Sequence, residues 1–135
     1  GAPSSEATST LNPASDDDVI VNTPTDYGNS YPVGQCTWGV KELAPWASNW
    51  WGNANTWAIY ASAQGYRVGN VPVVGAIAVW DGGEYGHVAY VTDVQSENSI
   101  QVLEANYKRQ KQIANYRGYF NPNEFLGRVT YIYPN

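Results

Sequence analysis

The positions of the aromatic residues are the feature that most constrains the fold of this 135-residue chain. They are confined to one part of it, and only that part has the large side chains needed for a core. All 6 Trp, 11 Tyr and 2 Phe lie at or after Tyr27, and such large side chains supply much of the apolar area that a small domain can bury. Residues 1–27 are instead rich in Ser, Thr, Pro, Ala and Asp, with no apolar period long enough for an element. The sequence therefore predicts a flexible linker over residues 1–27 and one folded domain over residues 28–135.

The charge and composition limit the partners. The net charge is −5 and the isoelectric point is near 4.6, whereas nucleic-acid binding needs clustered Lys and Arg, so no nucleic acid is expected. No apolar run approaches the length of a membrane span, so no membrane insertion is expected. Low charge with abundant Trp, Tyr, Asn and Gly is typical of a secreted bacterial domain. A monomer is the default expectation.

Proline, glycine and asparagine residues predict two helices. The first runs from Cys36 to about Leu43 and is stopped by Pro45, which cannot continue the hydrogen-bond ladder. The second is capped by Asn53 or Asn55 and ends at Gly65. Its residues at helical spacing are Trp57, Tyr60, Ala61 and Gln64, and the apolar and aromatic ones are expected in the core.

Strands are expected after Pro72. The predicted ranges are 75–80, 87–94, 100–107, 112–116 and 129–133. Asp81-Gly82-Gly83 is suited to a tight turn between the first two. Helices followed by strands indicate an α+β fold, in which the N-terminal helices pack on an antiparallel sheet.

The only histidine, His87, opens one predicted strand, and Asn106 nearly closes the next. An antiparallel hairpin places both at the same end of the sheet. Glu104 lies two residues before Asn106 and is expected on the same face. Either Glu104 or Asn106 could therefore accept a hydrogen bond from one ring nitrogen of His87. The sequence leaves the choice open, because the hairpin register is not visible in it.

Cys36 is the only cysteine, so it cannot form an intramolecular disulfide, and one Cys with one His falls short of a zinc site unless carboxylates complete it. At the start of a helix, unpaired backbone N–H groups and the helix dipole favour a thiolate. With His87 as base, Cys36 could attack an amide. The backbone N–H of Cys36 and the side-chain amide of Gln35 are candidate oxyanion donors. The alternative is a buried cysteine that only packs.

Four segments of the chain resemble the CHAP family, the cysteine, histidine-dependent amidohydrolases/peptidases, and they follow one another in the family's order. They are Tyr31–Gly39, Val74–Trp80, Tyr85–Val91 and Val102–Tyr107. The resemblance runs from about Tyr31 to the C-terminus and extends to the PcsB-like secreted cell-wall hydrolases of streptococci.

This resemblance implies a papain-like fold with Cys36 as nucleophile, His87 as general base, Glu104 orienting the histidine and Asn106 in support. It also implies peptidoglycan as the substrate and partner. The family cuts amide bonds either in stem peptides and cross-bridges or between muramic acid and L-alanine, and the motifs do not distinguish these. A role in cell-wall remodelling or daughter-cell separation outside a Gram-positive cell is implied.

No metal or cofactor is expected. The acids Asp16, Asp17 and Asp18 are contiguous and lack the alternate spacing of a calcium-binding loop.

Aromatic residues near the expected cleft are candidates to stack on substrate, with core packing as the alternative. They are Trp50, Trp51, Trp80 and Tyr85. The aromatic excess also suits a second function, a cell-wall binding or scaffolding module with little or no turnover. The intact set of Cys36, His87, Glu104 and Asn106 argues against that module, because a binder needs no reactive thiol.

Overall fold

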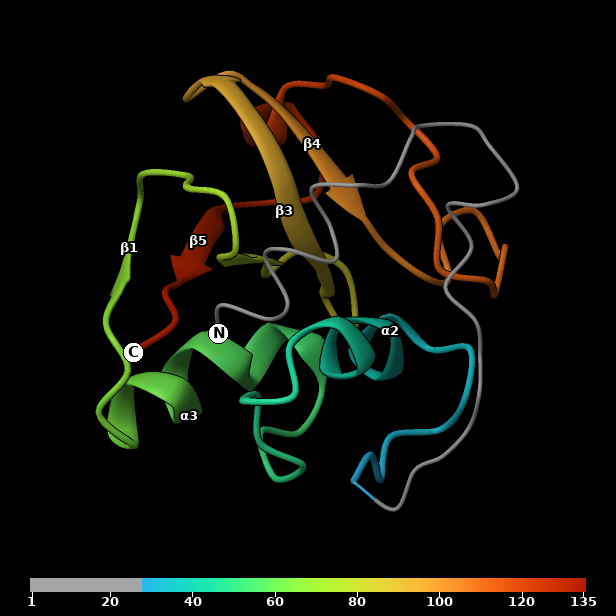
Figure 1. Cartoon of the computed structure of the whole chain (residues 1–135), viewed down its shortest axis with the longest axis vertical. Coiled ribbons are helices and arrows are strands. Elements are labelled where there is room, and N and C mark those ends of the chain that lie inside the picture. Colours follow the sequence, from blue (N-terminus) through green and yellow to red (C-terminus); the bar gives the residue numbers. More distant parts are fainter. Residues whose placement is uncertain (1–27) are drawn as a thin grey trace.

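The computed structural model describes residues 28–135, so the predicted linker over residues 1–27 lies outside the described residues. Helices and sheet form two layers, with helices α2 and α3 against one face of a five-stranded sheet (Figure 1). The helical elements are α2 (Cys36–Leu43), η2 (Ala54–Thr56), α3 (Trp57–Ala63) and η3 (Pro122–Glu124). The strands are β1 (Val68–Gly69), β2 (Ile77–Trp80), β3 (His87–Ser96), β4 (Ser99–Leu103) and β5 (Val129–Ile132). The predicted α+β class is therefore confirmed.

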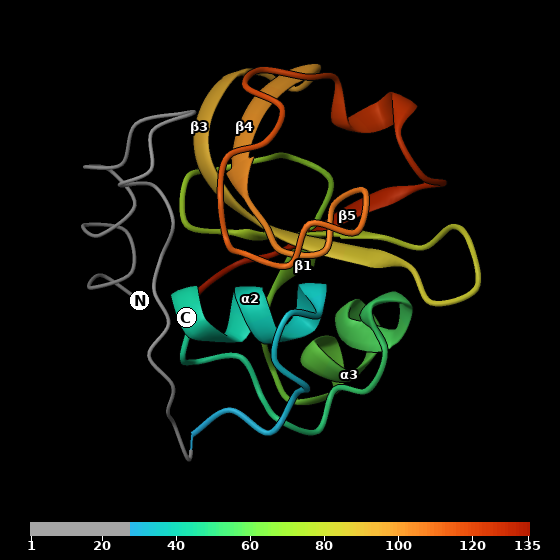
Figure 2. The same cartoon turned by 90° about the vertical axis from the view of Figure 1, so that its right-hand side faces the viewer.

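The sheet has the order β1-β5-β2-β3-β4, and every neighbouring pair is antiparallel. Its central strand β2 is buried on both faces, as a continuous apolar run predicts. One face packs on the helices through Ile77, Val79 and Val88. The other face is covered by the chain between β4 and β5, which contributes Phe120 and Phe125 (Figure 2). This second covering layer brings Arg117 and Phe125 close to His87, the first residue of β3.

The first predicted helix is confirmed, and the second is partly wrong. Trp57 and Ala61 are fully buried, but Tyr60 is 48% exposed because this short helix rests on the sheet through one narrow stripe and Tyr60 lies at its edge. Asn53 stands at the N-cap of η2 without a side-chain capping bond. Asn55 instead donates its backbone N–H to the Tyr85 carbonyl, 2.9 Å away, and ties η2 to the β2–β3 loop.

Two predicted strands are also corrected. The strand expected over 100–107 ends at Leu103, and the strand expected over 112–116 is reduced to one isolated bridge between Glu104 and Ala114. The two-residue strand β1 was not predicted.

No helix within residues 28–135 has the length and apolar character needed to cross a membrane.

Candidate active site

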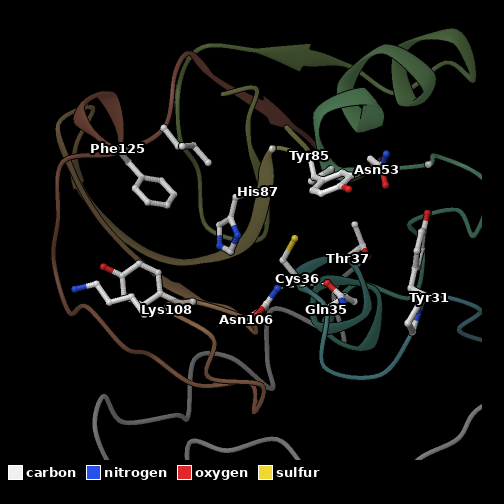
Figure 3. Close-up of a pocket in the computed structure, with 16 residues that line it drawn as sticks. Tyr31, Gln35, Cys36, Thr37, Asn53, Tyr85, His87, Asn106, Lys108 and Phe125 are labelled. Carbon is white, nitrogen blue, oxygen red and sulfur yellow. Dashed lines mark hydrogen bonds between the residues drawn. The ribbon is translucent and has the colours of Figure 1, made fainter. Parts of the chain in front are cut away.

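A cleft of about 940 Å³ opens where segments from across the chain meet. The start of α2, the turn before η2, the end of the β2–β3 loop, the segment after β4 and the loop after η3 all line it. Cys36 and His87 both line it, and the Cys36 sulfur lies beside the His87 ring (Figure 3). The structure therefore brings together the two residues that the sequence singled out for their chemistry.

Two features of helix α2 position Cys36: the backbone conformation at its N-terminus and the packing of the helix against the segment after β4. Gln35 occupies the N-cap with an extended backbone, so Cys36 is the first helical residue and its N–H is among those with no intrahelical acceptor. Further along, Gly39 packs against Ala105, and a Cβ on Gly39 would lie 2.9 Å from the Ala105 Cβ. This close approach sets the distance between α2 and the chain that leaves β4.

His87 is buried and wedged between aromatic rings. Its ring centroid lies 5.8 Å from that of Trp80 and 5.7 Å from that of Phe125. The preceding Gly86 has φ +76°, and a Cβ there would come within 2.7 Å of Asn55 and 2.6 Å of the Trp80 carbonyl. Only glycine fits this close approach of the β2–β3 loop to η2, which presents His87 at the first position of β3.

Glu104 is the partner of His87, which settles the alternative that the sequence left open. His87 Nε2 lies 2.9 Å from Glu104 Oε1. The pairing of Tyr90 with Leu103 would, if continued, set Asn106 opposite His87. The strand ends at Leu103, however, and Asn106 has a left-handed backbone with φ +59°. The expectation that Glu104 and Asn106 share one strand face is therefore wrong.

Asn106 contacts the other side of the site. Its Nδ2 donates to Gln35 Oε1 at 3.3 Å, and its Oδ1 accepts from Lys111 Nζ at 3.1 Å. Because Gln35 accepts through its oxygen, its Nε2 remains available as a donor. Gln35, Cys36 and Asn106 all line the cleft.

Arg117 is a component of the site that the sequence did not indicate. It binds both carboxylate oxygens of Glu104, with Nε 2.9 Å from Oε2 and Nη2 2.7 Å from Oε1. Its guanidinium carbon lies 4.0 Å from the ring centroids of both Phe120 and Phe125, and 4.2 Å from that of Tyr107. A single arginine within an aromatic run was the only local sign, and it does not reveal a partner thirteen residues away.

The charges of these groups depend on one another. Burial alone lowers the pKa of His87, but hydrogen bonds and charge from Cys36 and Glu104 outweigh it and raise the pKa to about 9. Burial alone raises the pKa of Glu104, but hydrogen bonds and charge from Arg117 and His87 reverse this and lower it. At neutral pH the arrangement thus favours an imidazolium beside a carboxylate.

Of the four aromatic residues predicted to contact substrate, only Tyr85 lines the cleft. Trp51 and Trp80 are completely buried, so neither ring can stack on a ligand, and both belong to the core. Trp50 is 82% exposed but does not line the cleft. Tyr85 is 58% exposed and does line it, as does Tyr31, which the sequence did not single out for contact.

Among residues 28–135, no three His, Cys, Asp or Glu side chains are grouped so as to hold a metal ion.

Comparison with known proteins identifies the family of this chain. Residues 26–106 match the family model of the CHAP domain. The chain is 62% identical over 109 residues to a protein of Streptococcus mutans serotype c assigned only to the hydrolases, covering 79% of this chain and 52% of that protein. It is 45% identical over 101 residues to the staphylococcal secretory antigen SsaA of Staphylococcus epidermidis, covering 74% of this chain and 39% of that protein.

A solved structure shows the same fold. The crystal structure of an N-acetylmuramoyl-L-alanine amidase from Staphylococcus aureus superposes with a TM-score of 0.68 at 29% identity, covering 89% of this chain and 36% of that one. The chain thus spans about half of the streptococcal relative and less of the staphylococcal ones. Since the family match extends over more than half of its residues, the chain belongs to the CHAP domain family and has that family's α+β, papain-like fold.

Proposed function

We propose that this chain is a cysteine-dependent hydrolase that cleaves an amide bond of peptidoglycan. The observation that carries the proposal is one constellation in a cleft: Cys36 at the start of α2 faces His87, and Glu104 holds the far nitrogen of that ring. Nucleophile, base and orienting group in this order are what acyl transfer through a thiol requires. The name of the staphylococcal amidase with the same fold supports peptidoglycan as the substrate.

The first half of the proposed reaction forms a thioester. The Cys36 thiolate attacks the amide carbonyl, and the resulting oxyanion accepts hydrogen bonds from the Cys36 backbone N–H and the Gln35 side-chain amide. Asn106 keeps Gln35 oriented by donating to its oxygen. His87, protonated beside Glu104, gives a proton to the departing amine as the carbon–nitrogen bond breaks.

The second half releases the acyl product. Water attacks the thioester while neutral His87 accepts its proton, and the carbon–sulfur bond breaks to restore the Cys36 thiolate and the imidazolium. Glu104 keeps the same ring nitrogen throughout, so the nitrogen that faces Cys36 carries each proton.

The proposed setting is the bacterial cell wall. The name of the secretory antigen among the relatives supports a secreted or wall-associated protein. We infer action as a monomer in wall remodelling or daughter-cell separation, with Tyr85 in the cleft contacting glycan or peptide. Residues 28–135 are proposed to be the catalytic domain.

The test is mass spectrometry of fragments released from purified peptidoglycan by the wild type and by Cys36→Ala. We expect the substitution to lower release by about three orders of magnitude or more, because no other thiol exists to form the thioester. New free amines at a stem or bridge residue would identify an endopeptidase, and free L-alanine N-termini an amidase.

Unchanged circular dichroism and unchanged pelleting of Cys36→Ala with the wall are the controls for folding and binding. Lysis retained by Cys36→Ala would rule out the thioester route. Release by neither protein, with pelleting intact, would favour the binding or scaffolding module instead.

A further inference from the structure

A tight turn beside the cleft has a sequence that is poorly suited to its backbone. Tyr107 pairs with Gln110, and the Gln110 N–H donates to the Tyr107 carbonyl at 3.0 Å, which leaves two residues to make the turn. These are Lys108 with φ +51° and Arg109 with φ +71°. Positive φ at both central positions is the mark of a type I′ turn, for which Asn-Gly is strongly preferred.

Lys and Arg are costly in this conformation. A left-handed backbone brings the Cβ of an ordinary residue too close to the following carbonyl, and Lys or Arg lacks the short polar side chain that relieves Asn. Backbone strain of this kind is tolerated where side chains are needed for function. Nothing in the hydrogen bonding of the turn requires Lys108 or Arg109, since a backbone bond closes it and the one side-chain bond to it comes from Gln110.

The position of Lys108 indicates what it is needed for. It lines the cleft on the same side of His87 as Phe125, whereas Tyr31 and Asn53 lie on the other side (Figure 3). Among the residues that line the cleft, it is the only Lys, Arg, Asp or Glu. Its ammonium lies 5.5 Å from the centroid of the Tyr107 ring, and Tyr107 is stacked on Tyr116.

The charge of Lys108 is also unopposed locally. Three of the seven Lys and Arg residues of the chain fall within the four residues 108–111. Lys111 is engaged by Asn106, but within residues 28–135 no carboxylate forms an ion pair with Lys108. The cleft therefore has one cationic end, adjacent to the reacting groups.

We propose that Lys108 forms a subsite for a carboxylate of the peptide substrate, and that the strained turn is kept in order to present its ammonium to the cleft. This inference rests on the proposed function and adds to it a substrate feature, a free carboxylate near the scissile amide. Arg109 shares the strained turn but does not line the cleft, which makes it a matched control.

The first test separates stability from activity. Lys108→Asn and Arg109→Gly each relieve one strained residue, so each should raise Tm by about 2–5 °C. Lys108→Asn should nevertheless lower kcat/KM for fragment release from peptidoglycan by about two- to fivefold, chiefly through KM, the effect expected of one exposed ion pair. Arg109→Gly should keep the wild-type kcat/KM.

The second test changes the substrate. The same peptidoglycan is treated with carbodiimide and ammonia, which converts its carboxylates to carboxamides. Wild type and Arg109→Gly should each lose about two- to fivefold in kcat/KM on the amidated wall. Lys108→Asn should cleave both walls at equal rates, because it has no ammonium to lose a partner.

The outcomes distinguish this inference from the function on which it rests. Equal cleavage of both walls by the wild type, or an equal loss on amidation for Lys108→Asn, would overturn the carboxylate subsite and leave the hydrolase intact. A loss in Arg109→Gly as large as that in Lys108→Asn would indicate general charge attraction instead of a subsite. No release by the wild type beyond the Cys36→Ala blank would overturn the hydrolase itself, and the subsite with it.

Discussion

At the scale of single residues, the site is governed by one carboxylate with two partners. Glu104 Oε1 lies within hydrogen-bond distance of both His87 Nε2 and Arg117 Nη2, so the three groups cannot titrate independently. Glu104 is fully buried, and an unpaired carboxylate there would be very costly. Arg117 compensates that charge while lying between the rings of Phe120 and Phe125.

Substituting Arg117 should therefore change how the site titrates. Arg117 holds down the pKa of Glu104, so removing its positive charge should raise the pKa of Glu104 and of its partner His87. In Arg117→Met, the pH profile of kcat/KM should move about one unit to higher pH. The free energy of unfolding should fall by about 3–5 kcal/mol, because Glu104 loses its compensation.

Arg117→Lys is the control, since it keeps the charge but not the paired hydrogen bonds. The pH profile of kcat/KM for Arg117→Lys should stay within a few tenths of a unit of the wild-type profile, compared with the shift of about one unit expected for Arg117→Met. A lower Tm for Arg117→Met with an unmoved pH profile would mean that Arg117 only supports the fold.

At the scale of elements, the position of helix α2 decides whether Cys36 reaches His87. The helix packs on the segment after β4, where Gly39 and Ala105 touch and leave no room for a methyl group. The same segment carries Glu104 and Asn106. One contact therefore holds the nucleophile, the orienting carboxylate and the amide that supports Gln35 at their mutual distances.

Gly39→Ala should disturb this arrangement. The added Cβ would lie 2.9 Å from the Ala105 Cβ and 3.3 Å from its backbone nitrogen, and neither atom belongs to a flexible side chain. We expect a loss of about 1–3 kcal/mol in the free energy of unfolding from overpacking. That loss is offset by at most about 1 kcal/mol of helix propensity. Displacement of Cys36 should lower kcat/KM by about tenfold or more.

Thermal denaturation and fragment release measure the two effects of Gly39→Ala. Gly28→Ala is the matched control, because nothing lies within 4 Å of a Cβ at that position. A Gly39→Ala protein with wild-type Tm and activity would show that α2 can shift without harm to the site.

At the scale of the whole molecule, the residues of the site come from segments that are distant in sequence. Cys36 comes from α2, His87 opens β3, Glu104 follows β4, and Arg117 belongs to the chain that covers the outer face of the sheet. The ionisation of His87 and Glu104 should therefore contribute to global stability as well as to activity.

The pH dependence of stability follows from the directions of the two shifts. The pKa of His87 is raised from 6.5 to about 9, so its contribution is complete below pH 6.5 and is lost as pH rises through 9. The pKa of Glu104 is lowered from 4.5, so its contribution is complete above pH 4.5 and is lost on acidification. Tm should be highest between about pH 4.5 and 6.5 and fall between pH 6.5 and 9.

His87→Asn removes the titrating ring and should flatten the decline in Tm between pH 6.5 and 9. A wild-type Tm that rises across that range would contradict the protonated state of His87 in the folded protein.

The sequence by itself determined what depends on residue type and on near neighbours. Helix 36–43 was predictable because Pro45 must end it, and Cys36 and His87 stood out because each is the only residue of its type. The alternation of apolar and turn residues was enough to predict the α+β class and most strands. These features arise from local backbone preferences, which act over a few residues.

Only the tertiary structure decided which groups meet. Glu104 pairs with His87 because the strand ends at Leu103 and Asn106 turns away, and Arg117 joins them from across the sheet. Trp51 and Trp80 proved to be core residues because other layers cover them. Register, burial and long-range ion pairs depend on segments far apart in the chain. Their free energy is gained only when those segments pack together, so no local pattern in the sequence reports it.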